Sequence, residues 1–355
     1  MKHVMKRTAA IGLAGVLTMS MLTGCGSMDN EDVVATVGTD KITVGMANFY
    51  ARMQQAQYET YYASMMGTTG EAMWSQEVDD KGTTYEESVK ESLLTSLEDM
   101  YLMKQHADEY EVVVTDEETK KIQEAAKKFD EDNTLEDKEA VSGYQKYVEE
   151  FLRLVTIQQK MNAPMKAGVN EEVSDEEAAQ KSMKYVYFPY TTTDAEGNQT
   201  DMTDEEKATL KTTAQTFADN LNANETKDID TVAAEGGYEV QSATFDAESV
   251  SPNADLVKAV DALTTEGEVT SVIESDSGLY VGKLVSLLDR EATDQKKTSI
   301  VEERKQEQYE KLLETWRKDT KIEENEKIWN KIDFEKLGVS IKQSEEQYDD
   351  TPAAE

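Results

Sequence analysis

The hydrophobic pattern changes twice along the chain, and this change restricts the fold more than any other feature. Apolar residues recur at steps of three and four over 84–107, 141–162 and 294–318, as in amphipathic helices. Between them, residues 183–188 read Met-Lys-Tyr-Val-Tyr-Phe, which is typical of a strand. The predicted order β-α-α-β-α-β-β over 180–290 indicates a small α+β domain. We therefore expect an α+β protein in which a helical lobe is interrupted by this domain.

Short sequence patterns predict where individual helices, strands and loops begin and end. Four pairs fit the capping box and predict helix starts: Thr84 with Glu87, Thr115 with Glu118, Ser174 with Glu177, and Thr203 with Glu206. Strands are expected at 33–37, 268–273 and 279–287, and loops at 130–140 and 190–202. After residue 290 the pattern is helical. These C-terminal helices carry aromatic residues but no core of their own, so we expect them to pack against the N-terminal helices.

Charge and residue counts exclude several functional classes. The 355 residues carry a net charge of −36, which argues against binding nucleic acid or an anionic lipid surface. One Cys and two His leave no material for a disulfide framework, a multi-cysteine metal site or a Ser-His-Asp triad. No glycine-rich phosphate loop is present. We therefore expect no cofactor and no metal site.

The N-terminus has the pattern of an export signal. Lys2, Lys6 and Arg7 precede an apolar stretch over 9–22 that is too short to span a bilayer comfortably. The stretch ends in Leu22-Thr23-Gly24-Cys25, which resembles the lipobox of bacterial lipoproteins. That resemblance implies lipidation of Cys25, removal of residues 1–24, and an extracytoplasmic, lipid-anchored protein, as in a Gram-positive envelope. The alternative is an ordinary secretory signal in which Cys25 is incidental.

Several segments together resemble the PrsA/SurA-like foldase family. Val33 to Thr43 reads VVATVGTDKIT, and residues 93–107 followed by Val-Val-Val-Thr-Asp-Glu-Glu at 112–118 match the helix and the step after it. Gly267-Glu268-Val269-Thr270, followed by Ser277 to Val281, resembles the end of a parvulin domain. The resemblance implies a SurA-N-like chaperone lobe built from N- and C-terminal helices, interrupted by a parvulin-like peptidyl-prolyl isomerase domain.

With this resemblance, the predicted domains follow the chain in order. They are a signal peptide (1–24), a lipidated tether (25–32), an N-terminal helical chaperone lobe (33–175), a parvulin-like domain (176–290), C-terminal helices that complete the lobe (291–341) and a disordered acidic tail (342–355).

The isomerase site expected from the family is degenerate in this sequence. The two family histidines align with Lys184 and Tyr280, and no His occurs after residue 106. The proline-binding floor aligns with Leu256 and Pro252. The resemblance therefore implies a domain kept as a scaffold or peptide-docking module, with no assigned catalytic residue. The alternative is activity through a substitute network that uses Tyr280 and Tyr185.

Methionines are concentrated in the first helices, and flexible thioethers suit binding surfaces that accept many partners. The candidate client-binding residues are Met46, Phe49, Met53, Met65, Met66 and Met100. The alternative is that these residues fill an ordinary core.

The function expected from these features is a membrane-anchored foldase or chaperone that binds unfolded exported proteins. Two alternatives stay open: an active prolyl isomerase with a non-standard site, and a surface lipoprotein with one dedicated partner. Nothing in the sequence decides the oligomeric state or the clients.

Overall fold

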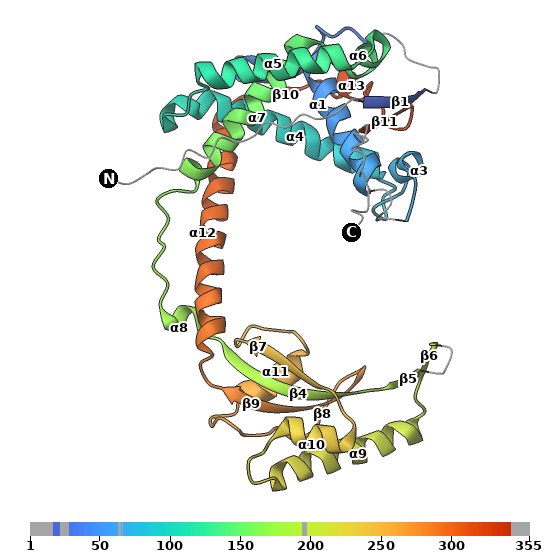
Figure 1. The fold of residues 1–355 in the computed structure, drawn as a ribbon, viewed down its shortest axis with the longest axis vertical. Coiled ribbons are helices and arrows are strands. Elements are labelled where there is room, and N and C mark those ends of the chain that lie inside the picture. The colour runs from blue at the N-terminus through green and yellow to red at the C-terminus, as the bar shows by residue number, and fades with distance from the viewer. Residues whose placement is uncertain (1–16, 22–27, 63–64, 66, 194–196, 342–355) are drawn as a thin grey trace, which may run out of the picture. The chain divides into compact units, whose positions relative to one another are not determined.

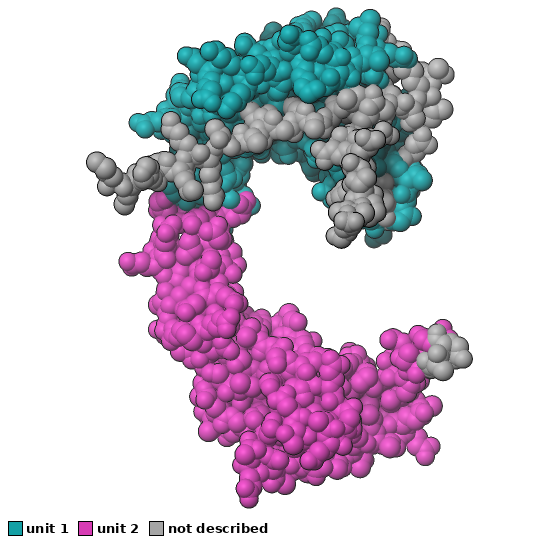
Figure 2. Space-filling model, in the orientation of Figure 1, with its two compact units in different colours: residues 1–167, 307–355 teal, residues 168–306 magenta. Residues whose placement is uncertain are grey.

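The computed structural model describes residues 17–21, 28–62, 65, 67–193 and 197–341 (Figure 1). Most of the predicted signal peptide, Cys25, Met66 and the predicted tail over 342–355 lie outside the described residues. The chain divides into two compact units, coloured in Figure 2: unit 1 comprises 1–167 and 307–355, and unit 2 comprises 168–306. The expected α+β class is confirmed. Unit 2 is wider than the predicted domain over 176–290.

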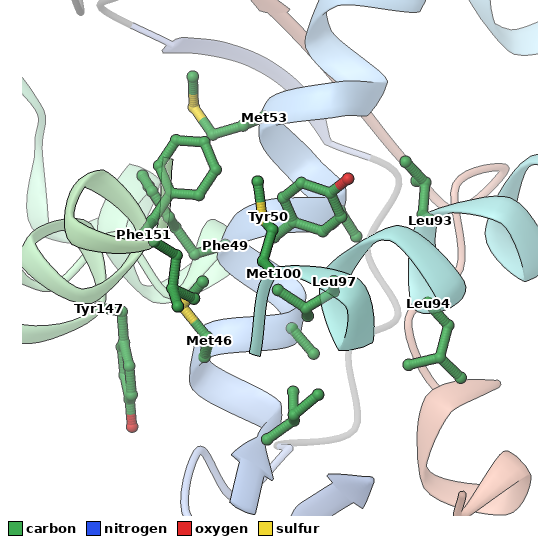
Figure 3. Packing of buried hydrophobic residues seen from close by; sticks show 14 of the residues in the cluster. Met46, Phe49, Tyr50, Met53, Leu93, Leu94, Leu97, Met100, Tyr147 and Phe151 are labelled. Carbon is green, nitrogen blue, oxygen red and sulfur yellow. The ribbon is translucent and has the colours of Figure 1, made fainter. Parts of the chain in front are cut away.

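Unit 1 is mainly helical. Its longer helices are α1 (Val44–Gln57), α4 (Tyr85–His106), α5 (Asp116–Asp132) and α7 (Gln145–Met165). Shorter turns lie between them: η1 (Tyr58–Tyr62, a π-helix), α3 (Gly70–Trp74), η2 (Ala107–Tyr110) and α6 (Leu135–Val141). Helix α1 is buried along most of its length and packs against α4 and α7 (Figure 3). The core of unit 1 therefore forms around α1.

Close packing at α1 depends on one small residue and one aromatic residue. The ring of Phe49 meets the rings of Phe129 and Phe151 edge-on, with centroids 5.4 and 5.6 Å apart. A Cβ atom on Gly45 would lie 2.0 Å from Cζ of Tyr147. Because no side chain fits at this position, Gly45 allows α7 to approach the start of α1.

The capping pattern predicted the starts of α4, α5 and the later α9 correctly, and these three contain complete capping boxes. Ser174 caps a helix of four residues, α8 (Asp175–Ala178).

The predicted loop over 130–140 is wrong, because α6 occupies 135–141. Thr134 and Asp137 form its capping box. Asp replaces the usual Glu or Gln of the capping box there, so the sequence does not show the usual pattern.

The C-terminal segment of unit 1 is only partly helical. It contains the end of α12 (Arg290–Asp319), β10 (Ile322–Glu324), α13 (Glu326–Trp329) and β11 (Leu337–Ile341). β10 pairs with β2 (Val33–Val37), which pairs in turn with β3 (Asp40–Thr43). The prediction of helix alone after 290 is therefore wrong, because these short strands are stabilised by partners distant in the sequence.

Two side chains on α12 attach it to unit 1. The ring of Trp316 stacks on His106 at the end of α4, with centroids 4.3 Å apart. Arg317 donates to Glu98, Asp99 and the backbone carbonyl of Thr95. The C-terminal segment therefore shares the core of the N-terminal helices.

A separate two-stranded sheet pairs a strand of the leader with a strand near the C-terminus. β1 (Leu17–Met21) pairs with β11 in antiparallel orientation, with Met19 opposite Val339. The sequence reading did not anticipate a strand in this part of the leader.

Unit 2 contains an antiparallel sheet with the order β7-β4-β9-β8. Its strands are β4 (Lys181–Pro189), β7 (Val240–Phe245), β8 (Ile273–Glu274) and β9 (Gly278–Ser286). Helices α9 (Asp204–Ala223) and α10 (Ile229–Gly236) contribute to the apolar cluster on one face, and α11 (Ala254–Asp261) to the cluster on the other. Side chains alternate along β4, so the sheet supplies residues to both clusters.

Two local predictions for unit 2 are wrong. The predicted loop over 190–202 contains the hairpin strands β5 (Thr191–Thr193) and β6 (Gln199–Asp201). In the predicted strand over 268–273, Val269 makes only an isolated bridge to Lys283, and β8 begins at Ile273. Both segments are short, and their pairing depends on neighbours that periodicity does not identify. Among the described residues, no helix has the length and apolar character needed to span a membrane.

Candidate functional site

The positions that align with the isomerase histidines lie on opposite faces of the unit 2 sheet. Lys184 forms an ion pair with Asp230 of α10. Tyr280 belongs to the cluster that includes α11. In the strand register Tyr280 lies opposite Tyr187, whereas Lys184 lies opposite Lys283. Lys184 and Tyr280, the two positions aligned with the family histidines, therefore do not form a common site.

Three tyrosines gather on the α11 face instead. The rings of Tyr187 and Tyr280 stack with centroids 4.6 Å apart, and the rings of Tyr185 and Tyr280 are 6.0 Å apart. The hydroxyl of Tyr187 donates to the carbonyl of Ser277 over 2.7 Å. The structure thus brings together Tyr185 and Tyr280, the two residues that the alternative interpretation named.

The two predicted floor residues have different surroundings. Leu256 is fully buried on α11, and a Cβ atom on Gly282 of β9 would lie 2.8 Å from its Cδ1 atom. Pro252 is half-buried in the turn that precedes α11. Leu256 therefore belongs to the Tyr280 cluster as a core residue that fixes α11 on the sheet.

The tyrosine cluster offers hydrogen-bond donors and apolar surface. Burial raises the pKa of the Tyr280 and Tyr185 hydroxyls, so both phenols stay neutral at physiological pH. A neutral phenol donates a hydrogen bond but is a weak base. Among the described residues, no group of three or more His, Cys, Asp or Glu could hold a metal ion. The cluster can therefore contact a peptide group but has no evident acid–base pair.

Four of the candidate client-binding residues lie in the core of unit 1. Met46, Phe49, Met53 and Met100 are all less than a tenth exposed, and Figure 3 shows them between α1, α4 and α7. In this conformation they cannot contact a client, and the core-filling interpretation applies to them. Met65 differs, because its side chain is 81% exposed.

Exposed apolar side chains of unit 1 occur at the end of α1. Tyr61 and Tyr62, in η1, are 51% and 49% exposed and precede the exposed Met65. We call these three residues the apolar turn. The ring of Tyr62 contacts that of Tyr58, which in turn contacts the buried Trp74. The turn is therefore supported by the core while its own side chains remain open to solvent.

A buried polar network fixes η1 beside β11. Glu59, within η1, accepts hydrogen bonds from Nε1 of Trp74, Nε2 of Gln55 and the backbone N–H of Val339, over 2.8, 2.6 and 2.8 Å. Burial raises the pKa of the Glu59 carboxyl, and these donors act against that shift. Arg52 donates to Gln55 and to the carbonyl of Leu337. α1, α3 and β11 are therefore held in one arrangement.

The sequence pattern did not identify the exposed turn or β11. The available signal was the run Tyr58-Glu-Thr-Tyr-Tyr62, which breaks the step of three and four residues. A π-helical turn puts consecutive side chains where an α-helix would not, and such turns are frequent at functional sites.

Comparison with known proteins gives one family match. Residues 1–150 match the family model of the SurA-like N-terminal domain. No protein of curated function matches the sequence.

Several solved structures are similar to this chain. The foldase protein PrsA from Lactococcus lactis is 14% identical, with 85% of this chain and 97% of that chain covered and a TM-score of 0.35. The foldase protein PrsA from Streptococcus pneumoniae is 18% identical, with 73% and 98% covered and a TM-score of 0.29. The peptidylprolyl isomerase PrsA from Bacillus anthracis is 17% identical, with 63% and 96% covered and a TM-score of 0.24.

Proposed function

We propose that this protein is an extracytoplasmic chaperone, anchored by lipid at Cys25, which binds unfolded exported proteins. The observation that carries the proposal is the exposure of the apolar turn of Tyr61, Tyr62 and Met65, next to a buried network that fixes Glu59 of η1. An exposed apolar surface on a rigid support can bind the apolar segments of an unfolded chain. The SurA-like match of residues 1–150, which contain the turn, supports this assignment.

The charge of the protein suits such a role. The net charge is −36 for the whole chain and more negative without the basic leader, and it keeps the chaperone and its complexes apart by mutual repulsion. It also attracts basic unfolded chains over distances comparable to the Debye length, about 8 Å at physiological ionic strength. Binding is expected to be tolerant of sequence, because apolar contact is not directional.

The test is suppression of aggregation of a denatured client, such as reduced lysozyme, by the wild-type chain and by a Tyr62→Ser, Met65→Ser variant. We expect the variant to bind the client about tenfold more weakly, since a loss of about 1.4 kcal/mol suffices for that factor. The matched control is Val113→Ser, Leu135→Ser, which alters two other exposed apolar residues of unit 1. Equal loss in both variants would remove the turn from the proposal, and no suppression by the wild type would reject it.

Membrane anchoring is tested separately. The Cys25→Ser variant should not be labelled by a radioactive fatty acid in cells, and this labelling, rather than membrane fractionation, decides the test. Two acyl chains bind a membrane stably, whereas an uncleaved leader would hold the protein without lipid. Labelling of the variant would show that lipid is attached elsewhere.

A second function, prolyl isomerisation, is favoured by one observation, the clustering of Tyr185, Tyr187 and Tyr280. Rotation about an X-Pro bond faces a barrier of about 18–20 kcal/mol, which a catalyst lowers in part by desolvating the amide. We expect little or no activity on X-Pro peptides, because the site has no evident acid–base pair. Acceleration that falls in Tyr280→Phe but not in Tyr309→Phe, a tyrosine of unit 1, would establish the second function instead.

A further inference from the structure

One edge of β11 is closed by side chains of α1 and η1. The N–H groups of Val339 and Ile341 donate to Glu59 and Thr60 over 2.8 and 3.1 Å. The carbonyl of Leu337 accepts from Nε2 of Gln55 over 2.6 Å. Residues 337, 339 and 341 thus direct their backbone groups toward α1 and η1. This fixes which edge of β11 faces these helices.

The opposite edge of β11 pairs with the leader. Since backbone groups alternate along a strand, Gly338 and Ser340 point to this second edge. In the register they lie opposite Ser20 and Thr18 of β1. Among the described residues, β1 is the strand that pairs with β11. The edge therefore accepts an extended segment in antiparallel orientation.

The segment seated there has a defined chemistry. β1 reads Leu-Thr-Met-Ser-Met, which alternates apolar and small hydroxyl residues and carries no charge. β11 itself is apolar at its buried positions and contacts η1, where the apolar turn begins.

Under the proposed function, residues 1–24 are removed from the mature protein, and β1 leaves with them. We propose that the edge of β11 is a binding site for an extended, uncharged apolar segment of an unfolded client, which adds as an antiparallel strand in the place of Leu17–Met21. Backbone hydrogen bonds supply sequence-tolerant affinity in this mode of recognition. The leader occupies the same site in the precursor. This inference rests on the proposed function, both for the client and for the cleavage.

The experiment uses full-length proteins and one probe, a fluorescein-labelled peptide of residues 15–23. Thr18→Pro, Ser20→Pro removes the two leader N–H groups that face β11 and should release β1. Met19→Pro is the matched control, because the N–H of Met19 points away from β11 in this register. The double variant should bind the peptide about tenfold or more tightly than the wild type or the control, in which the attached leader competes at high effective concentration.

Two modified peptides test the direction of the hydrogen bonds. N-methylation at Thr18 and Ser20 should abolish binding, whereas N-methylation at Met19 should preserve it. Hydrogen–deuterium exchange should show the peptide protecting residues 337–341, both in the double variant and in a chain that begins at residue 26. The second protein keeps the test valid if the proline variant misfolds.

The outcomes separate this inference from the proposed function. Equal affinity for all three proteins, or equal binding of the two methylated peptides, would overturn the β11 site. If the double variant still suppresses client aggregation in that case, the chaperone function stands without this site. If the wild type and both variants fail to suppress aggregation, the proposed function fails, while peptide binding at β11 would still be decided by the exchange data.

Discussion

The buried carboxyl of Glu98 allows a quantitative prediction about unit 1. Its side chain on α4 is fully buried, and Oε2 accepts from Arg317 over 2.9 Å. Its Oε1 atom has no hydrogen-bond partner among the described residues. Burial raises the pKa of Glu98 from 4.5 to about 7, against the effect of Arg317. We predict that Glu98→Gln, which resembles the protonated acid, stabilises unit 1 at alkaline pH.

The magnitude follows from the pKa. The folded state holds the Glu98 proton up to a pH of about 7, whereas the unfolded state releases it near 4.5. Between these values the folded state binds more protons, so this group's contribution to stability falls as the pH rises. At about 1.4 kcal/mol for each pKa unit, the full loss is about 3 kcal/mol above pH 7. The Gln variant should therefore gain about 3 kcal/mol over the wild type at pH 8.5 and nothing near pH 4.

Urea unfolding followed by tryptophan fluorescence measures this difference. The three tryptophans, Trp74, Trp316 and Trp329, all lie in unit 1, so the signal reports the unit that contains Glu98. The control is Glu91→Gln, which neutralises an exposed carboxyl on the same helix. Comparing the variants removes the contribution of other titrating groups, since these are common to all three proteins.

The difference between Glu98→Gln and the wild type must grow as the pH rises from 5 to 8.5. A constant difference would show that Glu98 keeps an ordinary pKa, and the burial argument would then be wrong. A Gln variant that is less stable at pH 8.5 would show that the bond to Arg317 outweighs the cost of burying the charge.

Three further predictions concern packing and capping. Gly45→Ala should destabilise unit 1 by about 1–3 kcal/mol in urea unfolding, because its Cβ would overlap the ring of Tyr147; an unchanged midpoint would mean that the ring moves freely. Thr115→Ala should cost about 1 kcal/mol in the same assay, through loss of the α5 capping box; no loss would show that solvent replaces the cap. Gly282→Val should separate α11 from the sheet by displacing Leu256, which circular dichroism would detect as a lower melting temperature for unit 2; an unchanged melting curve would contradict this close contact.

Local sequence signals predicted the elements that local interactions stabilise. The starts of α4, α5 and α9 follow from capping boxes, in which a Thr and a Glu three residues later satisfy each other's backbone groups. The strand β4 follows from its aromatic and β-branched run. In the candidate site, the absence of a His pair was also evident from the sequence, since it depends on composition alone.

The arrangement of the site residues could not be predicted in the same way. The resemblance aligned the two family histidines with Lys184 and Tyr280, but these residues lie on opposite faces of the sheet, and a one-residue difference in position on a strand is enough to move a side chain to the other face. The concentration of methionines grouped Met46 with Met65 as possible client contacts, although Met46 is buried in the core and Met65 is exposed. Burial depends on which helices pack together, and no local pattern records that choice.

The sequence by itself determined the order of most helices, the acidic surface and the change from helical to β-type pattern, because each depends on neighbouring residues or on composition. Only the tertiary structure decided that β11 lies between the Glu59 network and the leader strand, and that the aromatic side chains of η1 remain exposed. The position of β11 arises from backbone hydrogen bonds to residues far away in the sequence, such as Glu59 and those of the leader strand. Folding brings such residues together, whereas periodicity and capping act within a few residues of the chain.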